Sequence, residues 1–351
     1  MSRIRVLVVD DSTTVRERLV EALSADPDLL VVGQADNGRT AIELCLSLRP
    51  DVVTLDMMLP IMTGLAATEY IMAHCPTPIL IVSASTNRGE LFRTYEALAA
   101  GALDVLEKPT GAEIGDAWER KLISTVKLIS RIRVITHVRG KLSAAPRPDA
   151  TPRGGDARCD LIAIGASTGG PAAILELLSR LPSTFPLPLL IVLHIGQAFA
   201  ASLADWLDGL CPLGVSYATD GESLPPAGRG RVILAPPDRH LVLRGGRLRL
   251  TSTPERHSCR PSVDELFESI AREAGSRCLA CLLTGMGKDG AAGLLAIRRA
   301  GGVTIAQDEE SSVVFGMPRE AIALGAAERI LSIREIAPVL KALAVPGGRV
   351  A

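Results

Sequence analysis

Residues 161–178 read LIAIGASTGGPAAILELL, and their pattern predicts the architecture of the C-terminal half of the chain. The apolar run LIAI predicts a buried strand, and the glycine-rich GASTGG at 165–170 predicts a sharp turn. The segment after Pro171 has the apolar spacing of a helix. A buried strand that passes through a glycine turn into a helix is typical of a parallel sheet covered by helices.

The same alternation extends through both halves of the chain. The C-terminal half repeats it in LPLLIVLH, RVILAPP, RCLACLLT and GGVTIAQ, with an antiparallel hairpin predicted at HLVLRGGRLRLT (240–251). In the N-terminal half, IRVLVV, LLVVGQA, DVVTL, PILIVSA and ALDVLEK predict five strands alternating with five helices. We therefore expect an α/β fold with two doubly wound, mainly parallel-sheet domains: a (βα)5 domain, then a Rossmann-like domain with a hairpin.

A change of composition separates the two domains. Residues 141–158, KLSAAPRPDATPRGGDAR, are rich in proline, glycine, alanine and basic residues and lack apolar periodicity, which is typical of a solvated linker. The predicted division is 1–125 for the first domain, 126–158 for a helix extension and linker, and 159–345 for the second domain.

The composition narrows the classes of function. The 351 residues are 47% hydrophobic, and 38 basic against 39 acidic side chains leave a formal charge of -1, so no overall field attracts nucleic acid or an anionic membrane. The most apolar stretch, LPLLIVLHI at 187–195, is shorter than the roughly 18 residues of a membrane span. With no secretory signal and an odd seven cysteines, we expect a cytoplasmic protein with reduced thiols, no nucleic acid partner and no membrane insertion.

Polar residues gather at the predicted strand ends of the first domain, which share one edge of a parallel sheet. They are Asp10 and Asp11 after the first strand, Asp56 after the third, Ser83 after the fourth and Lys108 after the fifth. The three carboxylates suit Mg²⁺, and Asp56 can then attack a phosphoryl donor while Ser83 and Lys108 contact the phosphoryl oxygens. Singly, each residue has an ordinary structural interpretation, such as a helix cap or a surface charge.

The combination closely resembles the receiver domains of two-component response regulators, over about residues 1–125. The resemblance implies that Asp56 is the phosphoacceptor, that the Met58 carbonyl joins Asp10 and Asp11 on Mg²⁺, and that the Lys108–Pro109 bond is cis. Met58 and Thr63 depart from the acids common in related receivers, which bears on the lifetime of the phosphoryl group.

Ser167 lies in the glycine turn of GASTGG, the layout of a nucleophile elbow with helix N–H groups ready to stabilise an oxyanion. The alternative is a phosphate-cradling loop of a nucleotide site. His194 and Asp289 follow other predicted strands and favour the hydrolase, because a serine hydroxyl needs a base and that base needs a carboxylate. The rival bases are His240 and His257, and the rival carboxylates are Asp264 and Asp308.

Several motifs of this half, GASTGG, FAASLADWLD, CRPSVDELF, LLTGMGKDG and AQDEESSVVFGMPREAI, closely resemble the chemotaxis protein-glutamate methylesterases. The resemblance spans about 160–343 and implies Ser167 as nucleophile, His194 as base and Asp289 as its orienter, with Thr168 and Met286 near the oxyanion. Departures at Ile195, Gly196 and Gln197 are expected to alter substrate fit rather than chemistry.

The resemblance also implies the biology of the protein. Its substrates are methylated glutamates of chemoreceptors, and specific receptor glutamines for deamidation; its phosphodonor is a chemotaxis histidine kinase. Phosphorylation relieves repression by the receiver, and no metal is needed in the hydrolase half. Two rival functions remain: a non-enzymatic signalling adaptor that binds a nucleotide or partner through GASTGG, and a DNA-binding response regulator, for which no terminal helix-turn-helix or basic face is visible.

Overall fold

The computed structural model describes residues 3–84, 87–109, 116–132, 134, 159–226, 228 and 230–344. The chain divides into two compact units, residues 1–142 and 143–351. Residues 135–158, most of the predicted linker, lie outside the described part. The predicted boundary at 125 falls within a helix that runs to Ile129.

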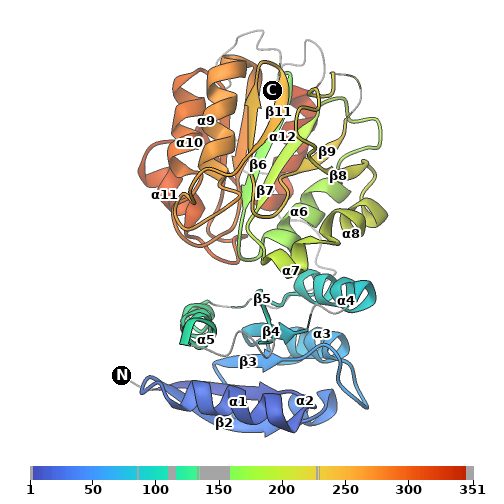
Figure 1. Cartoon of the computed structure of the whole chain (residues 1–351), viewed down its shortest axis with the longest axis vertical. Helices are drawn as coiled ribbons and strands as arrows, with labels where there is room; N and C mark the ends of the chain where they lie inside the picture. Colours follow the sequence, from blue (N-terminus) through green and yellow to red (C-terminus); the bar gives the residue numbers. More distant parts are fainter. Residues whose placement is uncertain are drawn as a thin grey trace. The chain divides into compact units, whose positions relative to one another are not determined.

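The first unit is a five-stranded parallel sheet in the order β2-β1-β3-β4-β5. Its elements are β1 Ile4–Val9, α1 Thr13–Ser24, β2 Leu29–Ala35, α2 Gly38–Leu48, β3 Val52–Leu55, α3 Gly64–His74, β4 Ile79–Ser83, α4 Arg88–Ala99, β5 Asp104–Glu107 and α5 Asp116–Ile129. Helix α1 packs beside α5, while α2, α3 and α4 pack in succession, so the helices form two groups on opposite faces (Figure 1). The predicted (βα)5 fold is confirmed.

Local sequence explains where these helices begin. Ser12, Asn37, Thr63 and Asn87 precede α1, α2, α3 and α4, and the side chain of each accepts a hydrogen bond from a backbone N–H in the first turn. The cap of α1 is Ser12, whose hydroxyl accepts from the Val15 N–H, and not the neighbouring Asp11. Thr63, noted as a departure from related receivers, serves as the cap of α3.

The second unit is a seven-stranded parallel sheet in the order β14-β13-β12-β6-β7-β9-β8, with a separate antiparallel hairpin, β10-β11. The strands are β6 Leu161–Ala166, β7 Leu189–Leu193, β8 Val215–Tyr217, β9 Val232–Leu234, β10 His240–Arg244, β11 Arg247–Thr251, β12 Cys278–Leu282, β13 Val303–Gln307 and β14 Arg329–Leu331. The predicted hairpin is confirmed at 240–251.

Helices cover both faces of this sheet. They are α6 Gly170–Ser179, α7 Gln197–Ala200, α8 Leu203–Leu210, α9 Val263–Ala274 with the short 3-10 helix Gly275–Arg277, α10 Ala291–Arg299, α11 Met317–Ala323 and α12 Ile333–Leu343. Helices α9, α10 and α11 pack on one face, and α6, α8 and α12 on the other (Figure 1). The central strands β6, β7 and β12 are wholly buried, which explains their unbroken apolar sequences.

Two glycines bring the start of α9 close to the sheet. A Cβ atom built on Gly165 would lie 2.3 Å from Cγ1 of Val263, and one built on Gly290 would lie 2.6 Å from the same atom. Only glycine leaves room for Val263 between β6 and the loop after β12. The first turn of α9 is thereby seated at the carboxyl edge of the central strands.

All seven cysteines are free thiols, as the sequence predicts. No helix among the described residues is long and apolar enough to span a bilayer.

Candidate functional sites

Each sheet has a point where the connections that follow two neighbouring strands run in opposite directions. In the first unit this point lies between β1 and β3, and in the second between β12 and β6. Ligand crevices of open α/β sheets lie beyond the carboxyl ends of the strands at such points. Asp10 follows β1, Asp56 follows β3 and Ser167 follows β6, so the predicted site residues occupy both crevices.

Ser167 occupies the tight turn between β6 and α6. Its backbone N–H donates to the Thr284 carbonyl at 3.0 Å, and its carbonyl accepts from the Gly170 N–H at 2.7 Å. Gly169, with φ of +76°, completes the turn in the left-handed region. Ser167 therefore lies just before the N-terminus of α6, where the helix dipole favours negative charge. The Gly170 N–H is already bound to the Ser167 carbonyl, and Pro171 has no N–H.

Thr168 and Met286 flank this turn. Thr168 is buried, and its carbonyl accepts from the Thr284 hydroxyl at 2.9 Å. A Cβ atom built on Gly285 would lie 2.7 Å from Cβ of Ser167, so the loop after β12 closely approaches the serine. Met286, next in that loop, has a 52% exposed side chain. The structure thus brings both predicted neighbours to the Ser167 turn.

His194 and Asp289 form a direct pair. Nε2 of His194 lies 3.0 Å from Oδ2 of Asp289, and the two side chains are 15% and 3% exposed. Burial opposes ionisation of Asp289, but hydrogen bonds from His194, Ser262 and the backbone hold its pKa below the ordinary value. The carboxylate is therefore ionised and accepts the proton on Nε2, so in the neutral ring the lone pair is on Nδ1.

The first turn of α9 fixes the Asp289 carboxylate. The Ser262 hydroxyl donates to Oδ1 at 2.7 Å, the Val263 N–H donates to Oδ2 at 2.7 Å, and the Asp264 N–H donates to Oδ1 at 3.1 Å. A carboxylate at a helix N-terminus is also favoured by the helix dipole. Both oxygens are thus held from two sides before any substrate binds.

The neighbourhood of His194 includes Cys259, whose Sγ lies 3.7 Å from Nδ1. Burial of His194 disfavours its charged form, but the hydrogen bonds with Asp289 and Cys259 outweigh this and raise its pKa to about 9. The sequence reasoning missed Cys259 and Ser262 as site residues, although both lie in the quoted motif CRPSVDELF.

Ser167 and His194 are brought together by strand pairing. Residues Ala166 and Leu193 are register partners in β6 and β7, and the His194 N–H donates to the Ala166 carbonyl at 3.0 Å. Among the described residues, no hydrogen bond joins the Ser167 hydroxyl to the His194 ring, whose Nδ1 contacts Cys259 instead. Hydrogen bonds of this kind commonly tighten only when substrate is bound.

The rival residues are engaged elsewhere. His240 is fully buried, its Nδ1 accepts from the Ser262 N–H at 3.1 Å, and its Nε2 lies 3.2 Å from the Pro254 carbonyl. His257 pairs with Asp264 at 3.2 Å, and Asp264 also accepts from the Gly293 N–H at 2.7 Å. Asp308 accepts from the N–H and hydroxyl of Ser311 within its own turn. These contacts stabilise the fold.

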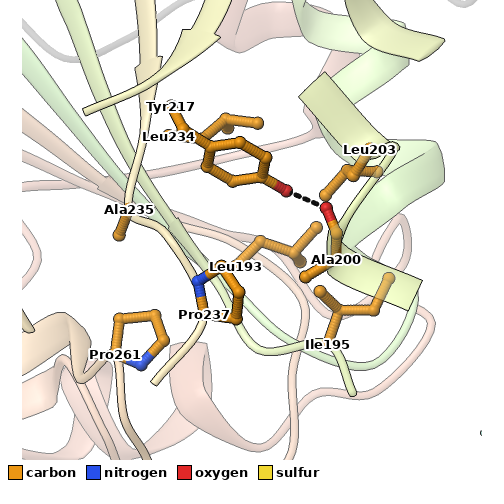
Figure 2. Close-up of a pocket in the computed structure, with 9 residues that line it drawn as sticks. All are labelled: Leu193, Ile195, Ala200, Leu203, Tyr217, Leu234, Ala235, Pro237 and Pro261. Atoms are coloured by element: carbon orange, nitrogen blue, oxygen red, sulfur yellow. Dashed lines mark hydrogen bonds between the residues drawn. The ribbon is translucent and has the colours of Figure 1, made fainter. Parts of the chain in front are cut away.

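A small apolar pocket is lined by Leu193 and Ile195, the two chain neighbours of His194 (Figure 2). It is lined by Leu193, Ile195, Ala200, Leu203, Tyr217, Leu234, Ala235, Pro237 and Pro261. The Tyr217 hydroxyl donates to the Ala200 carbonyl across its upper side (Figure 2). Ile195, one of the residues expected to alter substrate fit, is therefore part of a pocket wall.

The crevice of the first unit holds a buried charge cluster. Nζ of Lys108 lies 2.8 Å from Oδ2 of Asp10 and 2.9 Å from Oδ2 of Asp56. Burial raises the pKa of Asp10, although Lys108 opposes this. Burial disfavours the charged form of Lys108, but the two carboxylates outweigh it and raise the Lys108 pKa. The lysine thus offsets two carboxylates that would otherwise repel each other.

The donor set fits a divalent cation. Ligand oxygens of Asp10, Asp11 and Asp56 lie within 4.8 Å of one another. Oδ2 of Asp10 is buried and, apart from its ion pair with Lys108, has no hydrogen bond. Three carboxylates with an incompletely satisfied oxygen suit Mg²⁺, which prefers hard oxygen ligands and keeps several waters. Met58, the fourth predicted ligand through its carbonyl, lies in the loop after β3 with a 45% exposed side chain.

Ser83 and the Lys108–Pro109 bond lie at the same edge of the sheet. The buried Ser83 hydroxyl donates to Oε1 of Glu90 at 3.0 Å, since a buried hydroxyl requires a partner. The expectation that the Lys108–Pro109 bond is cis is wrong: within the described ranges the cis bond is Arg260–Pro261. The trans form is the default for such bonds, and Lys108 reaches both carboxylates from it.

Comparison with known proteins places these two crevices in a family. The model of the response regulator receiver domain matches residues 6–116, and the model of the CheB methylesterase matches residues 162–340. The fold and the two family matches together define a response regulator whose output domain is of an enzyme type. The chain belongs to the CheB methylesterase family.

Full-length relatives support the assignment. A protein-glutamate methylesterase/protein-glutamine glutaminase of Anaeromyxobacter dehalogenans (strain 2CP-C) is 45% identical over 341 residues, which cover 97% of each chain. Another of Myxococcus xanthus (strain DK1622) is 44% identical over 340 residues and 95% of each chain. The crystal structure of the Thermotoga maritima CheB methylesterase catalytic domain is 38% identical, with a TM-score of 0.49, covering 52% of this chain and 97% of that one.

Proposed function

We propose that the chain hydrolyses glutamyl methyl esters of chemoreceptors, releasing methanol, and deamidates specific receptor glutamines as part of chemosensory adaptation. Phosphorylation of Asp56 by a chemotaxis histidine kinase activates the hydrolase. The observation that carries the proposal is the buried His194–Asp289 pair at the strand edge beside the Ser167 turn. The names of the full-length relatives agree with this activity.

The proposed reaction proceeds through an acyl-enzyme. Oγ of Ser167 attacks the ester carbonyl while Nδ1 of His194 takes the hydroxyl proton, and Asp289 stabilises the resulting imidazolium. The C–O bond to the methoxy group then breaks, and His194 protonates the departing methoxide to give methanol. Water, deprotonated by the same nitrogen, hydrolyses the ester to Ser167 and restores the glutamate. With a glutamine substrate, ammonia leaves instead.

The negative charge on the carbonyl oxygen needs stabilisation during both attacks. The N-terminus of α6, with Thr168 beside the serine and Met286 in the facing loop, is the proposed oxyanion site. The apolar pocket with Ile195 on its wall is proposed to influence substrate fit.

Cys259 is a rival nucleophile because its Sγ lies 3.7 Å from Nδ1 of His194, the base nitrogen. Ser167 is preferred because it lies on the sharp turn between β6 and α6, the geometry of a nucleophile elbow. The N–H groups that start α9, near Cys259, already bind the Asp289 carboxylate and cannot stabilise a tetrahedral intermediate on Cys259.

In the receiver, Asp56 is the proposed phosphoacceptor, with Ser83 and Lys108 contacting the phosphoryl oxygens. Mg²⁺ held by Asp10, Asp11, Asp56 and the Met58 carbonyl would supply positive charge to the transferring phosphoryl group. The proposed division of the chain is a receiver over 1–125, a helix extension and linker over 126–158, and a hydrolase over 159–345. Free thiols and a kinase partner fit a cytoplasmic location.

The direct experiment measures methanol release from methylated chemoreceptors by the full-length chain, with and without acetyl phosphate and Mg²⁺. Ser167→Ala should reduce the rate by at least about a thousandfold, as loss of a triad nucleophile does. Ser179→Ala, an exposed serine at the end of α6, is the matched control. If Ser167→Ala retains the rate and Cys259→Ala loses it, the nucleophile is the thiol.

The receiver assignment has its own test. Acetyl phosphate with Mg²⁺ should label the wild-type chain and raise its methanol release, and should do neither with Asp56→Asn. Equal labelling of Asp56→Asn and the wild type would show that another residue is phosphorylated.

A further inference from the structure

We propose that Sγ of Cys259 and Nδ1 of His194 form a binding site for a thiophilic divalent cation, Zn²⁺, which inhibits the hydrolase by occupying the base nitrogen. The inhibition rests on the proposed function, whereas the binding itself does not. Ligand atoms of Cys259, His194 and Asp289 lie within 4.8 Å of one another. Thiolate and imidazole are the preferred ligands of Zn²⁺.

The spacing of the two donors already matches the metal. Zn²⁺ binds thiolate sulfur at about 2.3 Å and imidazole nitrogen at about 2.0–2.1 Å, so a tetrahedral ion holds the two atoms about 3.6 Å apart. The observed distance from Sγ of Cys259 to Nδ1 of His194 is 3.7 Å. The distance between the two donor atoms therefore already suits the ion.

Asp289 completes the arrangement from the other side of the ring. Its Oδ2 accepts from Nε2 of His194 at 3.0 Å, which leaves Nδ1 as the nitrogen able to bind a metal. A histidine ligand whose second nitrogen donates to a carboxylate is the usual arrangement around protein-bound zinc, because the carboxylate fixes the tautomer and ring orientation.

The Cys259 sulfur is also fixed in position and accessible. Backbone hydrogen bonds in both directions between Arg256 and Cys259, at 3.2 and 3.0 Å, close a tight turn that has positive φ at His257 and Ser258. Arg256 is anchored on α9 by Glu268, with Nη2 to Oε1 at 2.6 Å. Cys259 is only partly buried, so an ion can enter from solvent, and waters can fill the remaining coordination positions.

Binding releases the thiol proton of Cys259 to solvent and, below about pH 9, the Nδ1 proton of His194 as well; it involves no change of oxidation state. With the lone pair of Nδ1 committed to the metal, His194 can no longer accept the proton of Ser167. The site therefore makes the enzyme sensitive to free Zn²⁺ through Cys259, which neither attacks the ester nor transfers a proton in the proposed reaction.

Metal binding is tested on the full-length chain, freed of metal by a chelator, with Co²⁺ as a spectroscopic probe. A thiolate-to-cobalt charge-transfer band should appear in the wild type and in Ser167→Ala, and should be lost in Cys259→Ser. Cys211→Ser, which removes another partly exposed thiol of the same unit, should keep the band. Absence of the band in the wild type, or its loss in Cys211→Ser alone, overturns the site.

Inhibition is tested by methanol release at increasing Zn²⁺, with each variant normalised to its own metal-free rate. The concentration for half inhibition should rise at least about tenfold in Cys259→Ser and stay unchanged in Cys211→Ser. Equal sensitivity of Cys259→Ser and the wild type overturns the proposal. Because the cobalt band is measured in Ser167→Ala as well, failure of the nucleophile assignment and failure of the metal site give different results.

Discussion

Nε2 of His194, and not Nδ1, lies 3.0 Å from Oδ2 of Asp289. In the familiar serine-protease triad the carboxylate binds Nδ1, and Nε2 is the base. Here the roles of the two nitrogens are exchanged, so the proton from Ser167 is expected to arrive at Nδ1. This orientation also places the base nitrogen next to Cys259.

Replacing Asp289 tests the exchange of roles. In Asp289→Asn the side-chain amide donates to Nε2, which forces the proton onto Nδ1 and removes the base. Methanol release should fall by about ten-thousandfold, the effect of the same change in a serine-protease triad. Asp308→Asn, a carboxylate engaged in the Ser311 turn, is the control and should retain activity. Comparable rates for the two variants would contradict the assignment.

The pKa of His194 predicts the pH dependence of hydrolysis. Since the neutral ring is the base and its pKa is raised to about 9, kcat/KM should increase with pH and level off above about 9 in chelator-treated enzyme. The same pKa shift makes the stability of the folded chain decrease, not increase, with rising pH. The raised pKa stabilises the folded chain fully below pH 6.5, and this contribution is lost as the pH rises through about 9. An activity inflection near 6.5 would show that Asp289 does not act on the ring.

Ser262 is predicted to position the Asp289 carboxylate. Ser262→Ala removes the 2.7 Å hydrogen bond to Oδ1, and a hydrogen bond to a charged group contributes about 1.5–3 kcal/mol. We expect kcat to fall at least about tenfold with KM unchanged. Ser269→Ala, within α9, also loses a buried hydrogen bond, which its hydroxyl accepts from the Leu243 N–H, and should lose stability without losing kcat. Equal kcat values for the two variants would show that Ser262 contributes to stability and does not position Asp289 for catalysis.

Lys108 is predicted to be essential for the stability of the receiver. Lys108→Met leaves the buried carboxylates of Asp10 and Asp56 without a cation, which should cost about 3–5 kcal/mol in urea unfolding. Added Mg²⁺ should recover part of that loss. Lys127→Met, which removes ion pairs with Asp26 and Asp28 at a more exposed position, should have a much smaller effect. The idea fails if the two variants unfold alike.

Gly285 is predicted to set the shape of the Ser167 turn. In Gly285→Ala the new Cβ would lie 2.3 Å from Sδ of Met317 and 2.7 Å from Cβ of Ser167, so the turn must shift and methanol release should fall. Gly209→Ala, in α8 with nothing within 4 Å, should keep full activity. It should also raise the free energy of unfolding by about 0.5–1 kcal/mol, since alanine is the better helix former. Unchanged activity in Gly285→Ala would show that the approach tolerates a methyl group.

Sequence alone predicted the fold because its buried strands are short, continuous and apolar, and because each leads into a helix through glycine or a capping residue. Parallel strands end at one shared edge of the sheet, where ligands bind. The sequence therefore identified as candidate site residues those that follow such strands: Asp10, Asp56, Ser167 and His194. Asp289 was found in the same way after β12.

Ser262 and Cys259 could not be found in that way. They lie in an irregular segment between the hairpin and α9, where no periodicity predicts the direction of a side chain. The nitrogen of His194 that contacts Asp289 is likewise set by tertiary packing. Similarly, the bond from Ser83 to Glu90 depends on how α4 packs, which strand patterns do not specify.

The Asp289 carboxylate is bound by the same N–H groups that start α9, so one set of contacts serves both the folding of that helix and the orientation of the imidazole. This part of the site is therefore already ordered once the chain has folded. Binding of an ester substrate does not need to order it. Thermal unfolding of the N-terminal turn of α9 would therefore abolish catalysis while the central sheet is still folded.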